Sequence, residues 1–412
     1  MKNFRLSRKL MMGAMLTCAL SASFTSCKDD DSDDSVVTPT ASGAPQKLIG
    51  IDITSNTTWS EDTIYVLTSR IKVRSGVTLT INPGTIVKGS QGQEANAKVL
   101  MVMRGAKLMA DGTASKPIIF TSILDKIQPG EIQSTLPNDL QGQWGGLAIL
   151  GNAKISKGTL DPTMSFDEAQ MEGVPATDLD GRYGGMNDAD NSGILRYVSV
   201  RHGGTSIGSG NELNGISFGG VGNGTIVENI EIVANADDGL EFYGGTVNAK
   251  NIIIWNNGDD ALDTDMAYNG TIDNFVLIGM EGSPLELDGP EGSYLNGNHT
   301  IKNGTVVTVR PDGTAAGDLI NYDVNTNVTL ENIHFVTVKA GQKVNSKSRA
   351  SRNTLTMSNI TINVAAADVV NYVDQAEPAI NTSVSAGTTG FANTSVFANW
   401  TWAEASGALT GL

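Results

Sequence analysis

The sequence has little cysteine, few aromatic residues and a deficit of basic residues. Its two cysteines, Cys18 and Cys27, both lie near the N-terminus, so no disulfide bond is expected in the rest of the chain. The 28 basic residues against 44 acidic ones give a net charge of −16, which argues against nucleic acid as a partner. Beyond the first residues no apolar run is long enough to span a bilayer. With 47 glycines and 6% aromatic residues, the composition is that of an all-β chain.

The N-terminus has the features of a secretory signal peptide. Four basic residues precede an apolar stretch, Leu10 to Phe24, that is too short for a membrane-spanning helix. The segment Phe24-Thr25-Ser26-Cys27 that follows resembles a lipobox, at which lipoprotein signal peptidase cleaves before a lipidated cysteine. We therefore expect a signal peptide over residues 1–26 and membrane attachment through a lipid on Cys27. Ordinary signal cleavage, with a free Cys27, is the alternative.

An acidic tether is expected after the lipidated cysteine. Lys28 to Asp34 contains five aspartates, and a Ser/Thr/Pro/Gly-rich run continues to about Gly43, a composition typical of disordered linkers. We assign the tether to residues 27–45. The acidic run resembles the surface-export signal of Bacteroidota lipoproteins, which implies a lipid anchor in the outer membrane with the protein facing outward. A solubilising linker on a periplasm-facing anchor is the alternative.

A repeat in the second half predicts a solenoid. Six segments place an asparagine before a β-rich run, with spacings of 22, 23, 29, 29 and 27 residues, about one turn of a parallel β-helix. Asparagine suits the corner of a coil because it tolerates a left-handed backbone and its amide can hydrogen-bond along a stack. The asparagines, to which we assign this structural role, are Asn229, Asn251, Asn274, Asn303, Asn332 and Asn359.

A second strand precedes four of these asparagines, and alternation assigns its two faces. Inward positions are taken by apolar residues such as Leu240, Leu262 and Leu285. Glu241, Asp263 and Glu286 must then point outward, one above another. The same holds for Tyr243, Asp265 and Asp288.

The rest of the chain is consistent with one domain over residues 46–412. The first half has short strands broken at glycine and proline, and residues 140–191 are expected to be a coil with a long surface loop. Residues 365–412 are assigned to a C-terminal cap, in which Trp400 and Trp402 would cover the last coil. The fold class predicted is therefore all-β, a right-handed parallel β-helix.

Several motifs carry a resemblance to a known family. Gly142-Gln-Trp-Gly-Gly146, Ser192 to Val198, Gly219-Gly-Val-Gly222 and Asp237 to Val247 resemble a widespread family of β-helix lipoproteins and surface proteins, common in Bacteroidota, with a pectin-lyase-like fold. The family has no settled activity. The resemblance implies the fold and the cell-surface location.

The acidic residues of two consecutive coils form the main candidate site. Asn235-Ala-Asp237-Asp238-Gly-Leu-Glu241 is repeated 22 residues later as Asn257-Gly-Asp259-Asp260-Ala-Leu-Asp263. Stacked coils would hold these carboxylates about 4.8 Å apart, where they repel unless a proton, a basic residue or a cation relieves them. No basic residue occurs between Asp259 and Glu291, and Ca²⁺ with several oxygen ligands fits. The predicted calcium ligands are Asp237, Asp238, Glu241, Asp259, Asp260, Asp263, Asp265, Glu286 and Asp288. A solvated acidic face without an ion is the alternative.

A second, less complete calcium motif precedes these coils. Asp188-Ala-Asp190-Asn-Ser192-Gly193 has the spacing of the start of a calcium loop, with Asp188, Asp190 and Ser192 as ligands. The acidic residue expected at the end of such a loop is replaced by Ser199.

Two function classes follow from these residues. The first is a binding or adhesion module whose calcium-ordered face holds a surface glycan or an envelope protein, with the outward Tyr243 available for sugar stacking. The second is a polysaccharide-cleaving enzyme: Asn-x-Asp and Gly-Asp-Asp in consecutive coils resemble polygalacturonase-type hydrolases, which would make Asp237, Asp259 and Asp260 catalytic. The Gly-His-Gly expected one coil later is absent, and His334, between inward Ile333 and Phe335, is expected at the surface.

Overall fold

The computed structural model describes residues 43–412 except 93–95, 209–210, 345–353 and 374–382. The predicted signal peptide, Cys27 and most of the acidic tether lie outside the described residues. Among the described helices, none is both long and apolar enough to cross a membrane.

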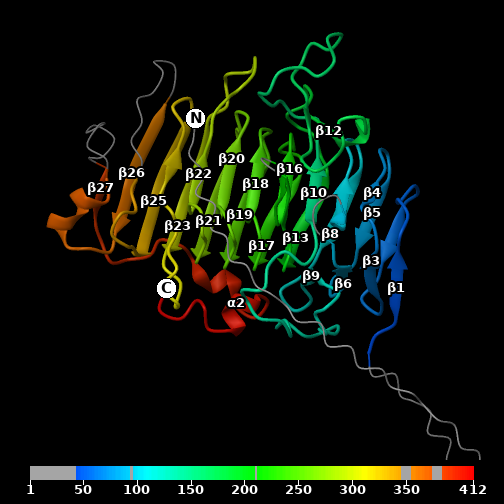
Figure 1. Ribbon diagram of the computed structural model, residues 1–412, viewed down its shortest axis with the longest axis horizontal. Coiled ribbons are helices and arrows are strands. Elements are labelled where there is room, and N and C mark those ends of the chain that lie inside the picture. The colour runs from blue at the N-terminus through cyan, green and yellow to red at the C-terminus, as the bar shows by residue number, and fades with distance from the viewer. Residues whose placement is uncertain (1–42, 93–95, 209–210, 345–353, 374–382) are drawn as a thin grey trace, which may run out of the picture. The chain divides into compact units, whose positions relative to one another are not determined.

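Two parallel sheets run along the chain and build a β-helix, which confirms the predicted fold (Figure 1). The first sheet contains fifteen strands. Its central order is β1 (Gln46–Ile49), β3 (Ile64–Leu67), β6 (Ile86–Gly89), β9 (Ile118–Ser122), β13 (Gly193–Arg201), β17 (Ile226–Val233), β19 (Asn248–Trp255), β21 (Thr271–Ile278), β23 (His299–Val307), β25 (Val328–Thr337), β26 (Leu355–Ile362) and β27 (Val384–Ala386), with β2 (Thr57–Trp59), β5 (Thr78–Ile81) and β8 (Lys107–Asp111) beside it.

The second sheet has eight shorter strands and carries the acidic residues. In spatial order they are β4 (Ile71–Val73), β7 (Val99–Val102), β10 (Gly146–Leu150), β16 (Ile216–Gly219), β18 (Leu240–Tyr243), β20 (Leu262–Asp265), β22 (Leu285–Leu287) and β24 (Asn321–Tyr322). Between the two sheets lies a continuous apolar core in which aromatic rings stack from coil to coil. Phe218 and Phe242 are 5.1 Å apart at their ring centroids, and Phe242 and Tyr268 are 4.7 Å apart.

The asparagine repeat forms the corner of the coil, as predicted. All six asparagines have φ between 54° and 62°, a left-handed conformation that bends each long strand of the first sheet. Their amides hydrogen-bond along the stack: Asn251 Nδ2 donates to Asn229 Oδ1 at 3.0 Å, and Asn274 Nδ2 donates to Asn251 Oδ1 at 2.8 Å. The ladder is interrupted at Asn303, which donates to Asp273 instead.

The residues before the corners up to Asn332 form a column of alternating charge. Strand pairing stacks seven side chains in the order acidic, basic, acidic, basic, acidic, basic, acidic. They are Asp111, Arg196, Glu228, Lys250, Asp273, Lys302 and Glu331. Unlike charges therefore face each other across every step, which stabilises this register.

Two insertions leave the coils on the side of the second sheet. Residues 151–192 follow β10 and contain the antiparallel pair β11 (Ala169–Gln170) and β12 (Arg182–Tyr183) and a 3₁₀ helix, η2 (Leu179–Gly181). A hairpin of β14 (Thr205–Gly208) and β15 (Asn211–Leu213) precedes β16. The first insertion packs on the sheet through Tyr183, whose ring lies over Gly219 so closely that a Cβ there would come within 2.6 Å of it.

The C-terminal segment lies along the side of the β-helix, not over its last coil. After η3 (Ala366–Asn371) and β27, η4 (Thr394–Phe397) and α2 (Trp402–Ala405) run beneath β17 to β21 (Figure 1). Trp400 packs edge-on against Tyr197 at 5.4 Å, and Trp402 against Trp255 at 5.7 Å. The prediction that these tryptophans cover the last coil was therefore wrong: the sides of the long strands offered them a larger apolar surface.

A buried ion pair fixes this segment to the sheet. Arg201 and Glu231 are both fully buried, with 3.2 Å between Arg201 Nη2 and Glu231 Oε2. The other oxygen of Glu231 accepts a hydrogen bond of 2.9 Å from the backbone nitrogen of Ala403.

The segment also covers His334, whose predicted surface position was wrong. Its side chain is 1% exposed, its Nδ1 lies 2.8 Å from Thr361 Oγ1, and the ring of Phe391 packs against it. The alternation placed His334 outside the bore correctly, but it could not show that a later segment lies there.

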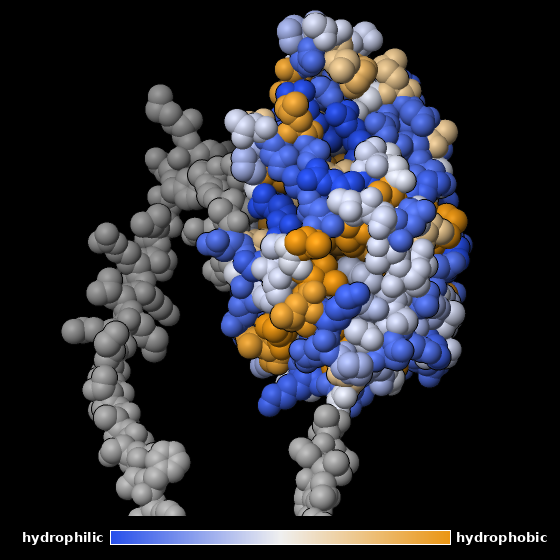
Figure 2. Space-filling view, turned by 90° about the vertical axis from the view of Figure 1, so that its right-hand side faces the viewer, coloured by the Kyte–Doolittle hydropathy of each residue, from blue (hydrophilic) through white to orange (hydrophobic). Residues whose placement is uncertain are grey.

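The end of the β-helix at β1 keeps apolar side chains exposed. Leu48 and Ile51 are 68% and 81% exposed. Figure 2, which views this end, shows hydrophobic residues gathered among hydrophilic ones.

Candidate functional site

Strand register brings the acidic residues of successive coils together. Glu241 on β18 lies beside Asp263 on β20, and Asp263 lies beside Glu286 on β22. Their neighbours Leu240, Leu262 and Leu285 stack inside the bore, so alternation turns the three carboxylates outward, as predicted. The pairs Asp237-Asp238 and Asp259-Asp260 occupy the turns that lead into β18 and β20.

These residues line a cavity of about 190 Å³, which we call the acidic cavity. Its lining consists of nine acidic residues and one asparagine, and no lysine, arginine, histidine or aromatic residue belongs to it. The lining residues are Glu172, Glu212, Asn214, Asp237, Asp238, Glu241, Asp259, Asp260, Asp263 and Glu286. In the part of the chain that the structure describes, this negative charge is therefore not neutralised by a basic side chain of the lining.

Two groups of three carboxylates in the acidic cavity have the geometry of metal ligands. Asp237, Asp238 and Asp259 each offer an oxygen within 4.8 Å of the others, and so do Asp238, Glu241 and Asp263. Asp237 Oδ2, Asp263 Oδ1 and Asn214 Oδ1 are buried without a hydrogen-bond partner. Because an unpartnered buried oxygen is costly, these three oxygens, which lack a partner among the described residues, are suited to bind a cation or a hydrogen-bond donor. The acidic clusters could thus bind a metal ion.

Hydrogen bonds hold several of the carboxylates in place. The backbone nitrogen of Asp260 donates to Asp238 Oδ1 at 2.9 Å, and that of Ser283 donates to Asp260 Oδ1. Asn214 Nδ2 donates to Glu241 Oε2, which turns the amide nitrogen of Asn214 toward β18. The lining is therefore organised before any ligand binds, which lowers the entropic cost of binding.

Burial and mutual repulsion raise the pKa values of the cluster. Burial, with repulsion from Glu212, raises the pKa of Asp237 to about 8. Burial, with a hydrogen bond to Glu286, raises the pKa of Asp260 to about 10, and burial with repulsion from Glu286 raises that of Asp259 to about 6. The pKa values of three others also lie well above the usual range because they are buried among carboxylates: Asp238, Glu241 and Asp263.

Two of the predicted calcium ligands lie outside the acidic cavity. Asp265 Oδ1 accepts a hydrogen bond of 2.6 Å from the backbone nitrogen of Met266, and burial with repulsion from Glu291 raises its pKa to about 7. Asp288 follows β22 and does not belong to the lining either. The remaining seven predicted ligands all line it.

The second calcium motif has protein partners for its carboxylates. Asp188 forms an ion pair of 2.6 Å with Lys154. Asp190 accepts hydrogen bonds from Asn152 at 3.0 Å and from Ser192 Oγ at 3.2 Å. These residues are not among the described groups with metal-ligand geometry, and the segment instead closes a turn of the first insertion.

Tyr243 is turned away from the bore but is not available to a sugar. It is 3% exposed because the first insertion covers it, with the ring of Tyr183 at 5.8 Å. Its predicted exposure was wrong, since the insertion supplies a second apolar layer outside the sheet.

Three lining residues were not found from the sequence. Glu172 comes from the first insertion, Glu212 from the β14–β15 hairpin and Asn214 from the residue next to that hairpin's end. The two insertions meet here, since the backbone nitrogen of Glu212 donates to Glu172 Oε2 at 2.8 Å. None of the three belongs to the repeat, so periodicity could not assign them.

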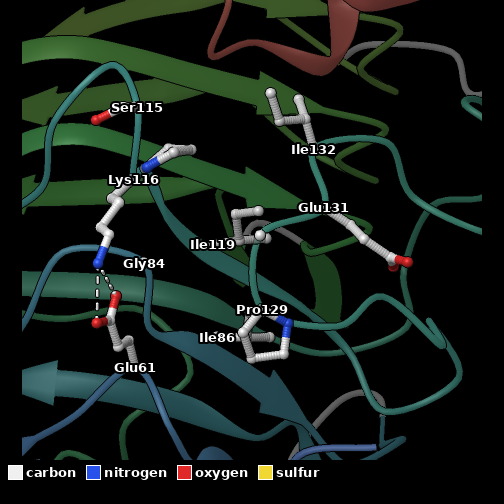
Figure 3. A pocket seen from close by; sticks show the side chains of 11 residues that line it. Glu61, Gly84, Ile86, Ser115, Lys116, Ile119, Pro129, Glu131 and Ile132 are labelled. Carbon is white, nitrogen blue, oxygen red and sulfur yellow. Dashed lines mark hydrogen bonds and ion pairs between the residues drawn. The ribbon is translucent and has the colours of Figure 1, made fainter.

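A second cavity, of about 300 Å³, lies between the first coils and residues 129–132 (Figure 3). Ile86, Ile119 and Ile132 form its apolar part. Its lysine, Lys116, is paired with Glu61 at 2.7 Å. This cavity offers no cluster of reactive groups.

The fold and the site define the class of protein, a parallel β-helix with an acidic cavity on the outer face of its second sheet. A family model, the pectate-lyase-like β-helix domain, matches residues 51–405, and the chain belongs to this family.

Among solved structures, the chain is similar to the Dettilon tailspike protein (gp208), with 11% sequence identity and a TM-score of 0.28. That match covers 78% of this chain and 64% of the tailspike chain, so this chain spans slightly less than two thirds of its length. The likeness carries no argument about function. No curated protein matches the sequence.

Proposed function

We propose that this protein is a lipid-anchored, cell-surface β-helix that binds Ca²⁺ in the acidic cavity and presents the surrounding surface to a glycan or an envelope protein. The observation that carries the proposal is the lining itself, in which the described residues include nine acidic ones, no basic one, and buried oxygens without a hydrogen-bond partner. Carboxylate and amide oxygens are the ligands Ca²⁺ prefers, six to eight of them at about 2.3–2.6 Å. Bound calcium would neutralise the carboxylates in place of basic residues, and it would coordinate the unpartnered oxygens of Asp237 and Asp263.

A partner would bind through calcium more than through the protein's own side chains. The lining has no aromatic ring for sugar stacking and no basic residue for an anionic group. A ligand that reaches the cavity would therefore be held by its own hydroxyl or carboxylate oxygens on the ion. Screening a glycan array with calcium and with chelator tests this, and binding that persists in chelator would contradict it.

Calorimetric titration of Ca²⁺ into chelator-treated protein tests the ion site. We expect binding at micromolar to millimolar affinity, lost in the variant Asp259→Asn/Asp263→Asn, which removes two charges with little change in volume. Asp312→Asn is the matched control, because Asp312 is an exposed acidic residue that does not line the acidic cavity. No binding heat and no calcium-dependent rise in melting temperature would contradict the proposal.

The anchor and the location rest on the sequence motifs alone and need their own test. Metabolic labelling with a palmitate analogue should mark the protein and fail to mark Cys27→Ser. Protease added to intact cells should degrade it if it faces outward. Labelling that survives Cys27→Ser would contradict the lipid anchor, and full protection from protease would contradict surface display.

A polysaccharide-cleaving enzyme is the second candidate, favoured by one observation. The pKa values of Asp259 and Asp260, about 6 and about 10, would leave one carboxyl ionised and the other protonated near neutral pH, as an acid–base pair requires. Incubation with polygalacturonate, followed by assays for new reducing ends and for unsaturated products, tests it. Cleavage that is lost in Asp260→Asn would replace the binding function by hydrolysis or elimination.

A further inference from the structure

We propose that the acidic cavity holds two Ca²⁺ ions bridged by the carboxylate of Asp238. The inference rests on the proposed calcium binding and specifies its stoichiometry and ligands. The two groups with metal-ligand geometry have Asp238 in common and no other residue. Asp237 and Asp259 complete the first group, and Glu241 and Asp263 complete the second.

Different parts of the fold supply the two groups. The first group comes from the turns that precede β18 and β20. The second adds to Asp238 the outward side chains of those strands themselves, Glu241 and Asp263, which are register partners. The five carboxylates do not form a single group at the 4.8 Å separation that each group satisfies. Since the ligands of one calcium ion all lie about 2.3–2.6 Å from it, two centres accommodate them better than one.

Each group also contains a buried oxygen that has no hydrogen-bond partner among the described residues. Asp237, a member of the first group, is 6% exposed, and its Oδ2 is the unpartnered atom. Asp263 Oδ1 is the corresponding atom of the second group. Asn214, 1% exposed, adds a third: its nitrogen is bound to Glu241, and its Oδ1 is unpartnered. Both groups therefore contain an unpartnered buried oxygen that is suited to coordinate a cation.

Charge leads to the same stoichiometry. One divalent ion would offset a small part of the nine acidic groups that line the cavity, and two ions offset twice as much. Glu212 and Glu172, which come from the two insertions, lie in the same lining and remain available to complete the coordination. Water would supply the remaining ligands.

The test counts ions in the purified protein and in variants that remove one group at a time. Equilibrium dialysis against Ca²⁺ should give two ions per chain in the wild type. It should give one in Asp259→Asn, which lacks a ligand of the first group, and one in Asp263→Asn, which lacks a ligand of the second. Asp238→Asn should weaken both sites at least tenfold, and Asp312→Asn should leave two.

Terbium luminescence distinguishes the two centres. Tyr243 contacts the second group, since its hydroxyl lies 3.5 Å from Asn214 Nδ2 and hydrogen-bonds with Glu241. Tyrosine-sensitised Tb³⁺ emission should therefore persist in Asp259→Asn and be lost in Asp263→Asn. Circular dichroism confirms that each variant is folded.

The outcomes separate this inference from the proposed function. No bound ion in the wild type would contradict calcium binding altogether. One bound ion, abolished by Asp259→Asn and by Asp263→Asn alike, would overturn the two-ion site and leave a single calcium site. Two ions, reduced to one by each single variant, is the result that the structure leads us to expect.

Discussion

Replacing Asp263 by asparagine should raise the stability of the calcium-free protein and lower that of the calcium-bound protein. Asp263 lies between Glu241 and Glu286 in the ladder of the second sheet. Two unit charges about 4.8 Å apart repel by about 3.5 kcal/mol at an effective dielectric constant of 20. Protonation relieves part of this repulsion, because burial among carboxylates raises the pKa of Asp263. The remaining gain from Asp263→Asn is about 1–3 kcal/mol.

Calcium should reverse the order of the two proteins. An ion at a concentration one thousand times its dissociation constant stabilises the folded state by about 4.1 kcal/mol, which exceeds the 1–3 kcal/mol that the variant gains in chelator. Asp263→Asn removes a ligand of the second group, so the variant loses the stabilisation that this ion supplies. For a chain of this size 1 kcal/mol corresponds to about 1–2 °C in melting temperature.

The assay is thermal unfolding of both proteins at one scan rate, in chelator and in millimolar calcium, with Asp312→Asn as control. We expect Asp263→Asn to melt about 1–6 °C above the wild type in chelator and below it in calcium. A variant that melts below the wild type in chelator, or that shows the full calcium-induced rise, would refute the electrostatic reasoning.

Three further predictions concern protons, the charge column and the coil corner. The pKa of Asp237 in the folded protein is about 8, above the usual 3.8. Between about pH 4 and 8 the calcium-free folded state therefore binds more protons than the unfolded state. The stability of the calcium-free protein should fall as the pH rises through this window. Calcium binding at pH 7 should then release protons, measured as calorimetric heats that depend on the ionisation enthalpy of the buffer; equal heats in all buffers would contradict this. Lys250→Glu would place three acidic side chains in succession along the charge column. It should lower the free energy of unfolding by about 0.5–1 kcal/mol, measured in denaturant at low salt, and Lys250→Gln should lower it less. An equal loss of stability in both variants would show that charge alternation is unimportant. Asn274→Ala keeps φ at 62° without the amide and should cost about 1–3 kcal/mol, while Asn274→Gly should recover part of the loss; the opposite order would refute a conformational role.

The repeat made the fold and much of the site predictable from the sequence. An asparagine every 22 to 29 residues set the length of each coil, and alternation over Leu240-Glu241 and Leu262-Asp263 set which side chain turns outward. Both signals are local, because a strand exposes alternate residues to opposite faces whatever surrounds it. The acidic residues of successive coils could therefore be aligned before their distances were known.

Residues outside the repeat could not be placed in this way. Glu172 and Glu212 reach the acidic cavity from insertions whose paths depend on contacts with distant coils, such as the packing of Tyr183 on Gly219. Asp265 and Asp288 have the same alternation as the cavity residues, yet they lie beyond its edge. Periodicity predicts on which face of the sheet a side chain lies. Which of these side chains line the cavity depends on how the insertions pack.

The sequence by itself determined the coil, its corners and the outward direction of the carboxylates, since these depend on the spacing of residues within one or two turns. Only the tertiary structure decided what covers each outward face. His334, Tyr243 and Trp255 are all outside the bore, and all are buried because segments far away in the chain pack over them. The same burial desolvates carboxylates that line the acidic cavity and raises their pKa values, and it depends on contacts that no local pattern records.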